Sequence, residues 1–197
     1  MKGDRLIMRL FIAIDPSAEQ KTSLQSLLRR LSGSLDGVTW VRPEGLHLTL
    51  KFLGEQEEGI LPDIIASMDK AAASMAPFNL QFGGAGVFPS PRRARVIWSG
   101  IRAGAEEVSY LASLLEKALA EKGFPVEKRS FIPHLTLGRL RRPQPGERIE
   151  RLLDEESSFA TEPAKVRSMR LYESHLSSRG ARYTIVKEIL FGKNRGK

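Results

Sequence analysis

A four-residue motif, His-Leu-Thr-Leu, occurs twice in this chain of 197 residues, at 47–50 and again at 134–137. Successive side chains of a β-strand point to opposite faces. If each copy lies on a strand, its histidine and threonine share one face and its two leucines share the other. Two of the three histidines of the chain belong to this repeat. The repeat therefore predicts two related halves, each presenting an imidazole beside a hydroxyl group.

The hydrophobic pattern around the two motifs predicts an α+β fold. Strands are expected at 8–14, 38–41, 46–53, 78–82, 94–101, 131–137, 164–173 and 181–191, and helices at 17–33, 57–75, 104–122 and 147–156. Short turns between successive strands favour antiparallel pairing. No linker separates the halves, so we expect residues 1–197 to form a single bilobal domain, with 1–7 as an extension and 193–197 as a tail.

The composition limits the classes of protein that the chain can belong to. Hydrophobic residues make up 41% and charged residues 27% of the chain, which is typical of a soluble globular protein. No apolar run approaches the ~20 residues that span a bilayer, and the first residues lack the features of a signal peptide. A cytoplasmic protein without a membrane partner is expected. The absence of cysteine excludes disulfides, thiolate metal sites and a cysteine nucleophile.

The net charge of +8 suits a polyanionic partner, although a basic but merely solvated surface would give the same value. Arginines gather in two places, at 92–95 and at 139–142. The second cluster begins two residues after the second motif, which favours a role in binding phosphate. Glycines 83, 84 and 86 lack the lysine pattern of a phosphate-binding loop. A bulge or bend in a strand is their better interpretation.

Two imidazoles on opposite walls of a cleft are suited to general acid–base catalysis, because histidine titrates near pH ~6.5. One ring can take a proton from water while the other gives a proton to a leaving oxygen. The threonine hydroxyls can bind phosphoryl oxygens. This chemistry requires no metal, and neither a zinc motif nor a serine-hydrolase motif is present. The alternative is that both histidines are ordinary strand residues held by hydrogen bonds.

Several segments beyond the motifs resemble a known family. They are 8–15, 46–55, 88–101, 131–139 and 171–183, spread over most of the chain. With the two H-x-T-x motifs they resemble the 2H phosphoesterase superfamily. The similarity is greatest to its branch of RNA 2′,3′-cyclic phosphodiesterases, historically called 2′-5′ RNA ligases.

The resemblance implies a bilobal fold with two antiparallel sheets related by a pseudo-twofold axis around a central cleft. It implies hydrolysis of RNA 2′,3′-cyclic phosphate ends, tRNA fragments among them, to 2′-phosphomonoesters, with reversible 2′-5′ joining as a side reaction. His47 is then the proton donor and His134 the proton acceptor, with Thr49, Thr136 and Arg139 binding the substrate. No cofactor or metal is expected, and the chain is expected to be a monomer.

Some assignments remain open at the level of sequence. A regular strand would place Arg139 on the face opposite His134, so a bulge near Gly138 would have to turn it inward. His175 fits a surface position, and three aromatic residues that could stack on a nucleobase, Phe11, Trp40 and Tyr172, fit the core as well. Two alternative functions also remain: a phosphodiesterase for another cyclic or 2′-5′-linked nucleotide, and a non-catalytic protein that binds RNA ends.

Overall fold

The computed structural model describes residues 6–177 and 180–192. Its strands are β1 (Ile7–Ile14), β2 (Val38–Trp40), β3 (Leu48–Glu57), β4 (Phe78–Phe88), β5 (Val96–Ala103), β6 (Leu135–Leu140), β7 (Ala164–Val166), β8 (Ser168–Ser177) and β9 (Gly180–Leu190). Its α-helices are α1 (Ala18–Ser34), α2 (Leu61–Ala73), α3 (Ala105–Ala120) and α4 (Gly146–Glu155), and its 3-10 helices are η1 (Pro43–Gly45), η2 (Glu58–Ile60) and η3 (Pro91–Arg93). The predicted α+β class is confirmed.

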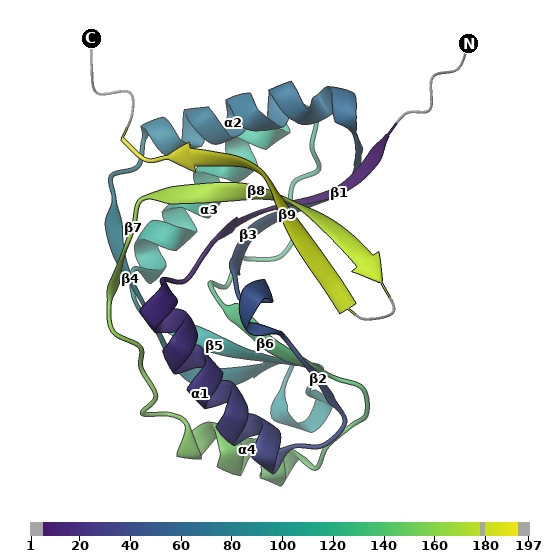
Figure 1. Ribbon diagram of the computed structural model, residues 1–197, viewed down its shortest axis with the longest axis vertical. Coiled ribbons are helices and arrows are strands. Elements are labelled where there is room, and N and C mark those ends of the chain that lie inside the picture. The colour runs from purple at the N-terminus through teal and green to yellow at the C-terminus, as the bar shows by residue number, and fades with distance from the viewer. Residues whose placement is uncertain (1–5, 178–179, 193–197) are drawn as a thin grey trace.

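The strands of the described residues form one antiparallel path in the order β7-β4-β5-β6-β3-β1-β8-β9, with β2 added beside β6. The sheet curls into two lobes, which Figure 1 shows one above the other. Lobe one contains β1, β3, β8 and β9 and is covered by α2 and α3; lobe two contains β2, β4, β5, β6 and β7 and is covered by α1 and α4. The bilobal arrangement is thus confirmed, and the two predicted sheets are joined where β3 meets β6.

A single residue pair, Leu48 with Leu135, joins β3 to β6. Each leucine is the second residue of its motif, so the two positions are equivalent. Equivalent residues face each other across antiparallel strands only at a local twofold axis. The strand order repeats on either side of this pair, as β3-β1-β8-β9 and as β6-β5-β4-β7. Both leucines are 0% exposed, so the axis passes through the hydrophobic core.

Local sequence explains where the helices begin and how they pack. Ser17 caps α1 in a capping box with Gln20. The buried amide of Gln20 then donates to the carbonyl oxygens of Leu80 and Glu162, at 2.7 and 3.0 Å, and so ties α1 to lobe two. One face of α1 carries buried leucines at helical spacing, namely Leu24, Leu27, Leu28 and Leu31. Pro62 lies in the first turn of α2, where its missing N–H costs nothing.

The structure corrects several predicted boundaries. The strand predicted from 131 begins at Leu135, because Pro133 lacks an N–H for a ladder; the strand predicted from 46 begins at Leu48, after η1. The strand predicted at 164–173 is two strands, β7 beside β4 and β8 beside β1. Residue 7 of the predicted extension belongs to β1. Residues 1–5 and the predicted tail lie outside the described residues.

The glycines at 83, 84 and 86 lie inside β4, which continues to Phe88 instead of ending at 82. The register with β5 shifts between Gly83 and Gly86, as expected for a bulge. A Cβ atom on Gly86 would lie 2.2 Å from Cζ2 of Trp98. Glycine is therefore needed here because the indole ring of Trp98 packs directly on the backbone of β4.

Candidate active site

The two motif histidines are held in the same way. Nδ1 of His47 lies 2.8 Å from the carbonyl oxygen of Gly45, and Nδ1 of His134 lies 2.7 Å from that of Ile132. In both cases the partner lies two residues earlier in the chain. A carbonyl oxygen only accepts, so each Nδ1 carries the proton and donates it. The neutral form of each ring therefore has its lone pair on Nε2, which is the nitrogen left to react.

The local twofold axis brings the polar residues of the two motifs to one face of the sheet. Leu48 and Leu135 point into the core, so their neighbours in the chain point to the opposite face. Continuing the antiparallel register by one residue sets His47 across from Thr136, and His134 across from Thr49. Each imidazole thus has the threonine of the other motif as its cross-strand neighbour. The two histidines and two threonines of the motifs lie around one axis, and all four side chains are half-buried.

A bulge follows each threonine and changes which residues share the face of the histidines. In lobe two, Trp98 of β5 pairs with Thr136 but Ile97 pairs with Gly138, so Leu137 is an extra residue in β6. The next pair, Val96 with Arg139, is back on the face of Thr136. The register shift that was required to turn Arg139 toward the face of the histidines is therefore present.

The same bulge occurs in lobe one, where sequence reasoning did not look for it. Ala13 of β1 pairs with Thr49 and Ile12 pairs with Lys51, so Leu50 is the extra residue. The following pair, Phe11 with Phe52, returns to the face of Thr49. Phe52 is thus the positional equivalent of Arg139. Aligning the two motifs would have identified it.

Aromatic rings fix the orientation of His47. Its ring centroid lies 4.7 Å from that of Phe11 and 5.1 Å from that of Tyr183, which meets it edge-on at 87°. Phe11 in turn stacks on Tyr172 at 5.2 Å and 15°. The hydroxyl of Tyr172 donates to Oδ2 of Asp15 at 2.6 Å, so the aromatic stack is tied to the end of β1. His47 therefore has little rotational freedom.

His134 has a matching but smaller set of aromatic neighbours. Phe88 meets its ring edge-on at 87° with the centroids 5.0 Å apart, and Trp98 lies 6.2 Å away. Both neighbours come from β4 and β5 of lobe two. In each lobe, one edge-on aromatic ring and one backbone carbonyl hold the catalytic candidate.

Burial lowers the pKa of His47 from its ordinary value. The hydrogen bond to Gly45 and the charge of Asp15 act in the opposite direction and raise this pKa, whereas the charge of Lys21 lowers it. His47 is consequently neutral at neutral pH in the unliganded protein. An anionic phosphate bound beside the ring would raise its pKa, because an opposite charge favours the protonated form.

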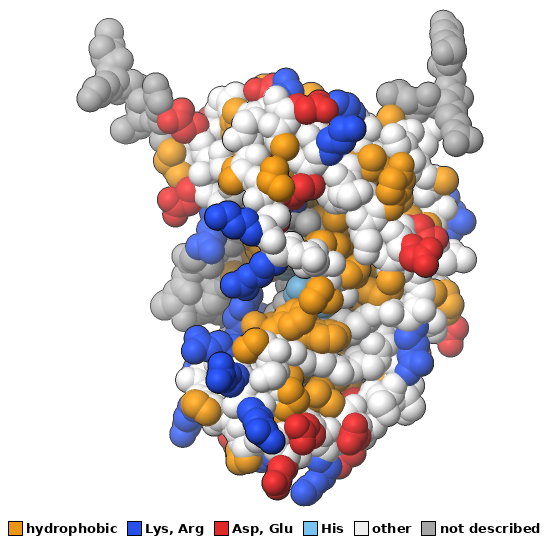
Figure 2. Space-filling view, turned by 180° about the vertical axis from the view of Figure 1, so that it is seen from behind, with side chains coloured by type: hydrophobic (Ala, Val, Ile, Leu, Met, Phe, Trp, Pro, Cys, Tyr) orange, Lys and Arg blue, Asp and Glu red, His pale blue; other side chains and the backbone are white. Residues whose placement is uncertain are grey.

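Cationic side chains border this region. Backbone pairing of β5 with β6 brings the two arginine clusters of the sequence together: Val96 pairs with Arg139, and the N–H of Leu140 donates to the carbonyl of Arg95 at 2.9 Å. Charges of Arg139 and Arg9 both act to lower the pKa of Tyr183, which burial raises. In Figure 2, Lys and Arg side chains gather beside a hollow in which part of a histidine is visible.

The remaining sequence candidates lie elsewhere or in the core. Phe11 and Tyr172 are 3% and 8% exposed, which confirms that they are core residues. Trp40 is half-buried and packs over Gly138, where a Cβ atom would lie 2.8 Å from its ring. His175 is exposed on β8, with Nε2 3.5 Å from Oε2 of Glu173. Among the described residues, no three His, Asp or Glu side chains are grouped to hold a metal ion, and no helix is long and apolar enough to cross a membrane.

A two-lobed α+β fold in which duplicated H-x-T-x strands meet at a local twofold axis is the architecture of 2H phosphoesterases. The sequence model of the family described as LigT like phosphoesterase matches residues 14–98 and 101–183, with one motif in each match. The chain belongs to this family.

Similar proteins span nearly the whole chain. An Archaeoglobus fulgidus protein named RNA 2′,3′-cyclic phosphodiesterase is 36% identical over 176 residues, which cover 89% of this chain and 96% of that protein. The crystal structure of a Thermus thermophilus protein, TT0787, has a TM-score of 0.79 at 28% identity, covering 95% of this chain and all of that one. Escherichia coli LigT complexed with 3′-AMP has a TM-score of 0.71 at 25% identity, with coverage of 95% and 100%.

Proposed function

We propose that this phosphoesterase hydrolyses RNA 2′,3′-cyclic phosphate ends to 2′-phosphomonoesters, without a metal, by acid–base catalysis between His47 and His134. The observation that carries the proposal is the pair of equivalent imidazoles around one axis, each with Nδ1 held by a carbonyl and Nε2 left to react. The names of the relatives support the choice of substrate.

In the proposed reaction, Nε2 of neutral His134 takes a proton from water while the water oxygen attacks phosphorus. The bond from phosphorus to the 3′ oxygen breaks, and Nε2 of protonated His47 gives its proton to that oxygen. The products are a 2′-phosphomonoester and a 3′-hydroxyl group. One histidine gains the proton that the other loses, so proton exchange with solvent restores the starting state. Thr49, Thr136 and Arg139 are proposed to bind the non-bridging oxygens as charge shifts onto them.

The role of His47 as the donor depends on its protonation. Because burial lowers its pKa, the donor form is sparsely populated in the free protein. The cyclic phosphate carries a negative charge, and its binding would restore the protonated form. We therefore expect the alkaline limb of the kcat profile to lie at higher pH than that of the kcat/KM profile.

The same chemistry also supports reversible 2′-5′ joining. If the 5′-hydroxyl of a second RNA attacks phosphorus in place of water, the 3′ oxygen leaves in the same way and a 2′-5′ phosphodiester remains. Comparing joining with hydrolysis on matched RNA ends measures how the site divides between the two.

The direct test measures hydrolysis of an oligonucleotide with a 2′,3′-cyclic phosphate end by His47→Ala and His134→Ala. Each is expected to lose activity while keeping its fold, and EDTA should leave the wild-type rate unchanged. His175→Ala is the matched control, because it removes the exposed third histidine of the chain.

Undiminished turnover in either motif variant would contradict the proposal. A non-catalytic RNA-end-binding protein would instead show no wild-type turnover and salt-dependent binding that requires its arginines. A phosphodiesterase for another cyclic or 2′-5′-linked nucleotide would prefer that substrate to RNA ends.

A further inference from the structure

The twofold symmetry of the lobes breaks at the strand edge beside each motif. In lobe two, β2 pairs with β6, and Trp40 lies opposite Gly138. The stretch 87 positions after β2 in the chain is 125–127. It lies beside β3 but is not assigned to any strand. Pro125 has no N–H to donate to a ladder, and Lys51 stands where lobe two has the glycine that makes room for Trp40.

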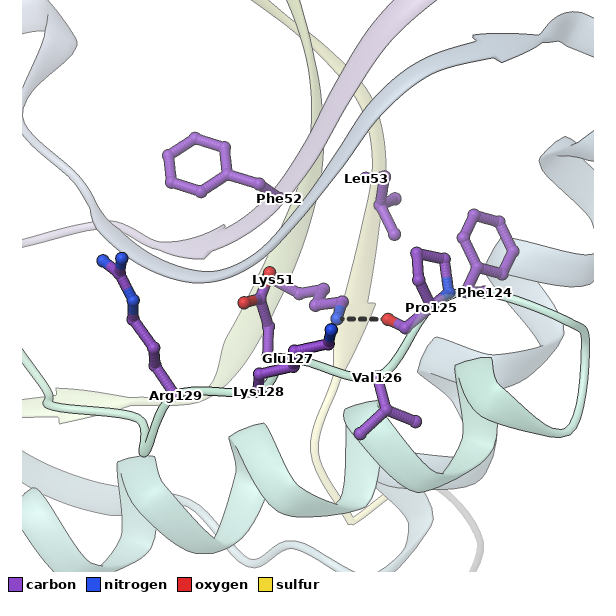
Figure 3. Close-up of a pocket in the computed structure, with 9 residues that line it drawn as sticks. All are labelled: Lys51, Phe52, Leu53, Phe124, Pro125, Val126, Glu127, Lys128 and Arg129. Atoms are coloured by element: carbon purple, nitrogen blue, oxygen red, sulfur yellow. Dashed lines mark hydrogen bonds between the residues drawn. The ribbon is translucent and has the colours of Figure 1, made fainter.

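A pocket of about 310 Å³ occupies this unpaired edge, between residues 51–53 of β3 and the segment 124–129 (Figure 3). Buried Lys51 forms its floor: its Nζ donates to Oε1 of Glu116 and to the carbonyl of Pro125, both at 3.0 Å. The backbone N–H of Glu127 donates to the same carboxylate of Glu116 at 2.6 Å. The pocket is thus held open by a hydrogen-bonded network that fixes the segment next to β3.

The mouth of the pocket combines an exposed aromatic ring with cationic groups. The ring of Phe52 is 63% exposed. Lys128 and Arg129 are exposed and form no ion pair within the described residues. Glu127 adds one negative charge, while Glu116 neutralises Lys51, so the mouth is net positive. Figure 3 shows the ring of Phe52 and the guanidinium of Arg129 extending toward the same side.

The pocket lies next to the proposed catalytic site. The ring centroid of Phe52 is 6.1 Å from that of Phe11, which is 4.7 Å from that of His47. Phe52 is therefore one aromatic ring removed from the candidate donor, on the same face of the sheet. An RNA chain whose cyclic-phosphate end lies at His47 can therefore reach the pocket with the nucleotide next to that end.

We propose that this pocket binds the nucleotide that precedes the cyclic-phosphate end of the RNA, with its base stacked on Phe52 and its phosphate at Lys128 and Arg129. The proposal rests on the function proposed above and names its substrate class. Stacking on an exposed aromatic side chain beside cationic groups is a general means of binding single-stranded RNA. A free 2′,3′-cyclic mononucleotide has no preceding nucleotide, so the pocket favours RNA ends over cyclic mononucleotides.

The test compares kcat/KM on a cyclic-phosphate-ended trinucleotide with kcat/KM on adenosine 2′,3′-cyclic monophosphate. Phe52→Ala and Arg129→Gln are each expected to lower the value for the trinucleotide by about tenfold, the loss of one stacked base or one phosphate contact. The value for the mononucleotide should not change. Tyr110→Ala and Lys117→Gln are matched controls, because they remove an exposed aromatic ring and an exposed charge from α3.

Equal losses on both substrates, or no loss on either, would overturn the pocket assignment while leaving the proposed function intact. A second measurement separates the two proposals: binding of the trinucleotide, with 2-aminopurine as its penultimate base, to His134→Ala. Quenching of the 2-aminopurine fluorescence on binding, if it is lost when Phe52→Ala is added, supports the pocket even if the wild type hydrolyses neither substrate. Quenching that is unaffected by Phe52→Ala counts against it.

Discussion

The two lobes place the same four-residue motif, His-Leu-Thr-Leu, in different surroundings. In lobe one, His47 packs against two aromatic rings that bury it, and Phe52 occupies the position after the bulge. In lobe two, Phe88 takes the edge-on position beside His134, and the position after the bulge is Arg139. The edge of β6 is closed by β2, whereas the equivalent edge of β3 opens into a pocket.

The features that the two lobes share have a different role from the features in which they differ. The shared features are the leucine pair on the axis, the bulge and the carbonyl that holds each Nδ1. These give two imidazoles with the same reactive nitrogen. The differing features lower the pKa of His47 through burial and place a phenylalanine or an arginine after the bulge. The symmetry of the lobes accounts for the two equivalent imidazoles, and its local breaks are consistent with the different roles proposed for them.

Removal of both histidines tests whether the lobes form one site. His47→Ala and His134→Ala are each expected to lower kcat by about 10²–10⁴-fold, because in the proposed mechanism each histidine makes a proton transfer in the same transition state. The double variant should be scarcely slower than the slower single variant, since groups that act as a unit are not additive. Single-turnover rates on a cyclic-phosphate-ended RNA measure this. Fully additive losses would mean that the two histidines contribute independently instead of as one acid–base pair.

The threonines test whether the lobes contribute equally to phosphate binding. Thr49→Val and Thr136→Val keep the branched shape and remove only the hydroxyl group. Each is expected to lower kcat by about 10–10²-fold, somewhat less than a fully buried donor to a developing charge. The ratio of the two losses in kcat reports how much each threonine hydroxyl contributes to binding the phosphate. If neither variant loses activity, the hydroxyl groups do not contact the phosphate.

Gly138 tests the structural difference between the two strand edges. Its Cβ would lie 2.8 Å from both Trp40 and Val38, so Gly138→Ala is expected to displace β2 and cost about 1–3 kcal/mol of unfolding free energy. Gly33→Ala is the control, because nothing lies within 4 Å of a Cβ there. Urea unfolding of both variants gives the comparison. Equal stabilities would show that β2 does not depend on close packing over Gly138.

Opposite shifts in the pKa of His47 are the smallest expected effects. The charge of Asp15 raises this pKa and that of Lys21 lowers it. Asp15→Asn should therefore lower the pKa of His47 and Lys21→Gln should raise it. A donor must be protonated, so the alkaline limb of kcat/KM should move in the same directions. Titration of the His47 ring by NMR checks the signs, and parallel shifts would contradict the electrostatic account.

Local patterns in the sequence predicted most of the fold and selected four candidate site residues that the structure brings to one face of the sheet. The repeated motif identified His47, His134, Thr49 and Thr136, because alternation along a strand fixes which side chains share a face. The neighbours of the histidines were not predictable in this way. Tyr183 and Phe88 reach them through strand pairings that no local pattern specifies. Phe52 was missed because its direction depends on a bulge, and a bulge reverses the alternation on which the prediction relied.

The proposed assignment of His47 as donor and His134 as acceptor is tested most directly with a substrate whose leaving group needs no proton. An RNA end whose cyclic phosphate carries sulfur in place of the 3′ oxygen releases a thiolate, which leaves without protonation because thiols are far more acidic than alcohols. We predict that His47→Ala hydrolyses this substrate nearly as fast as the wild type, whereas His134→Ala stays inactive. Rescue of His134→Ala instead, or of neither variant, would contradict the assignment of the donor to lobe one and the acceptor to lobe two.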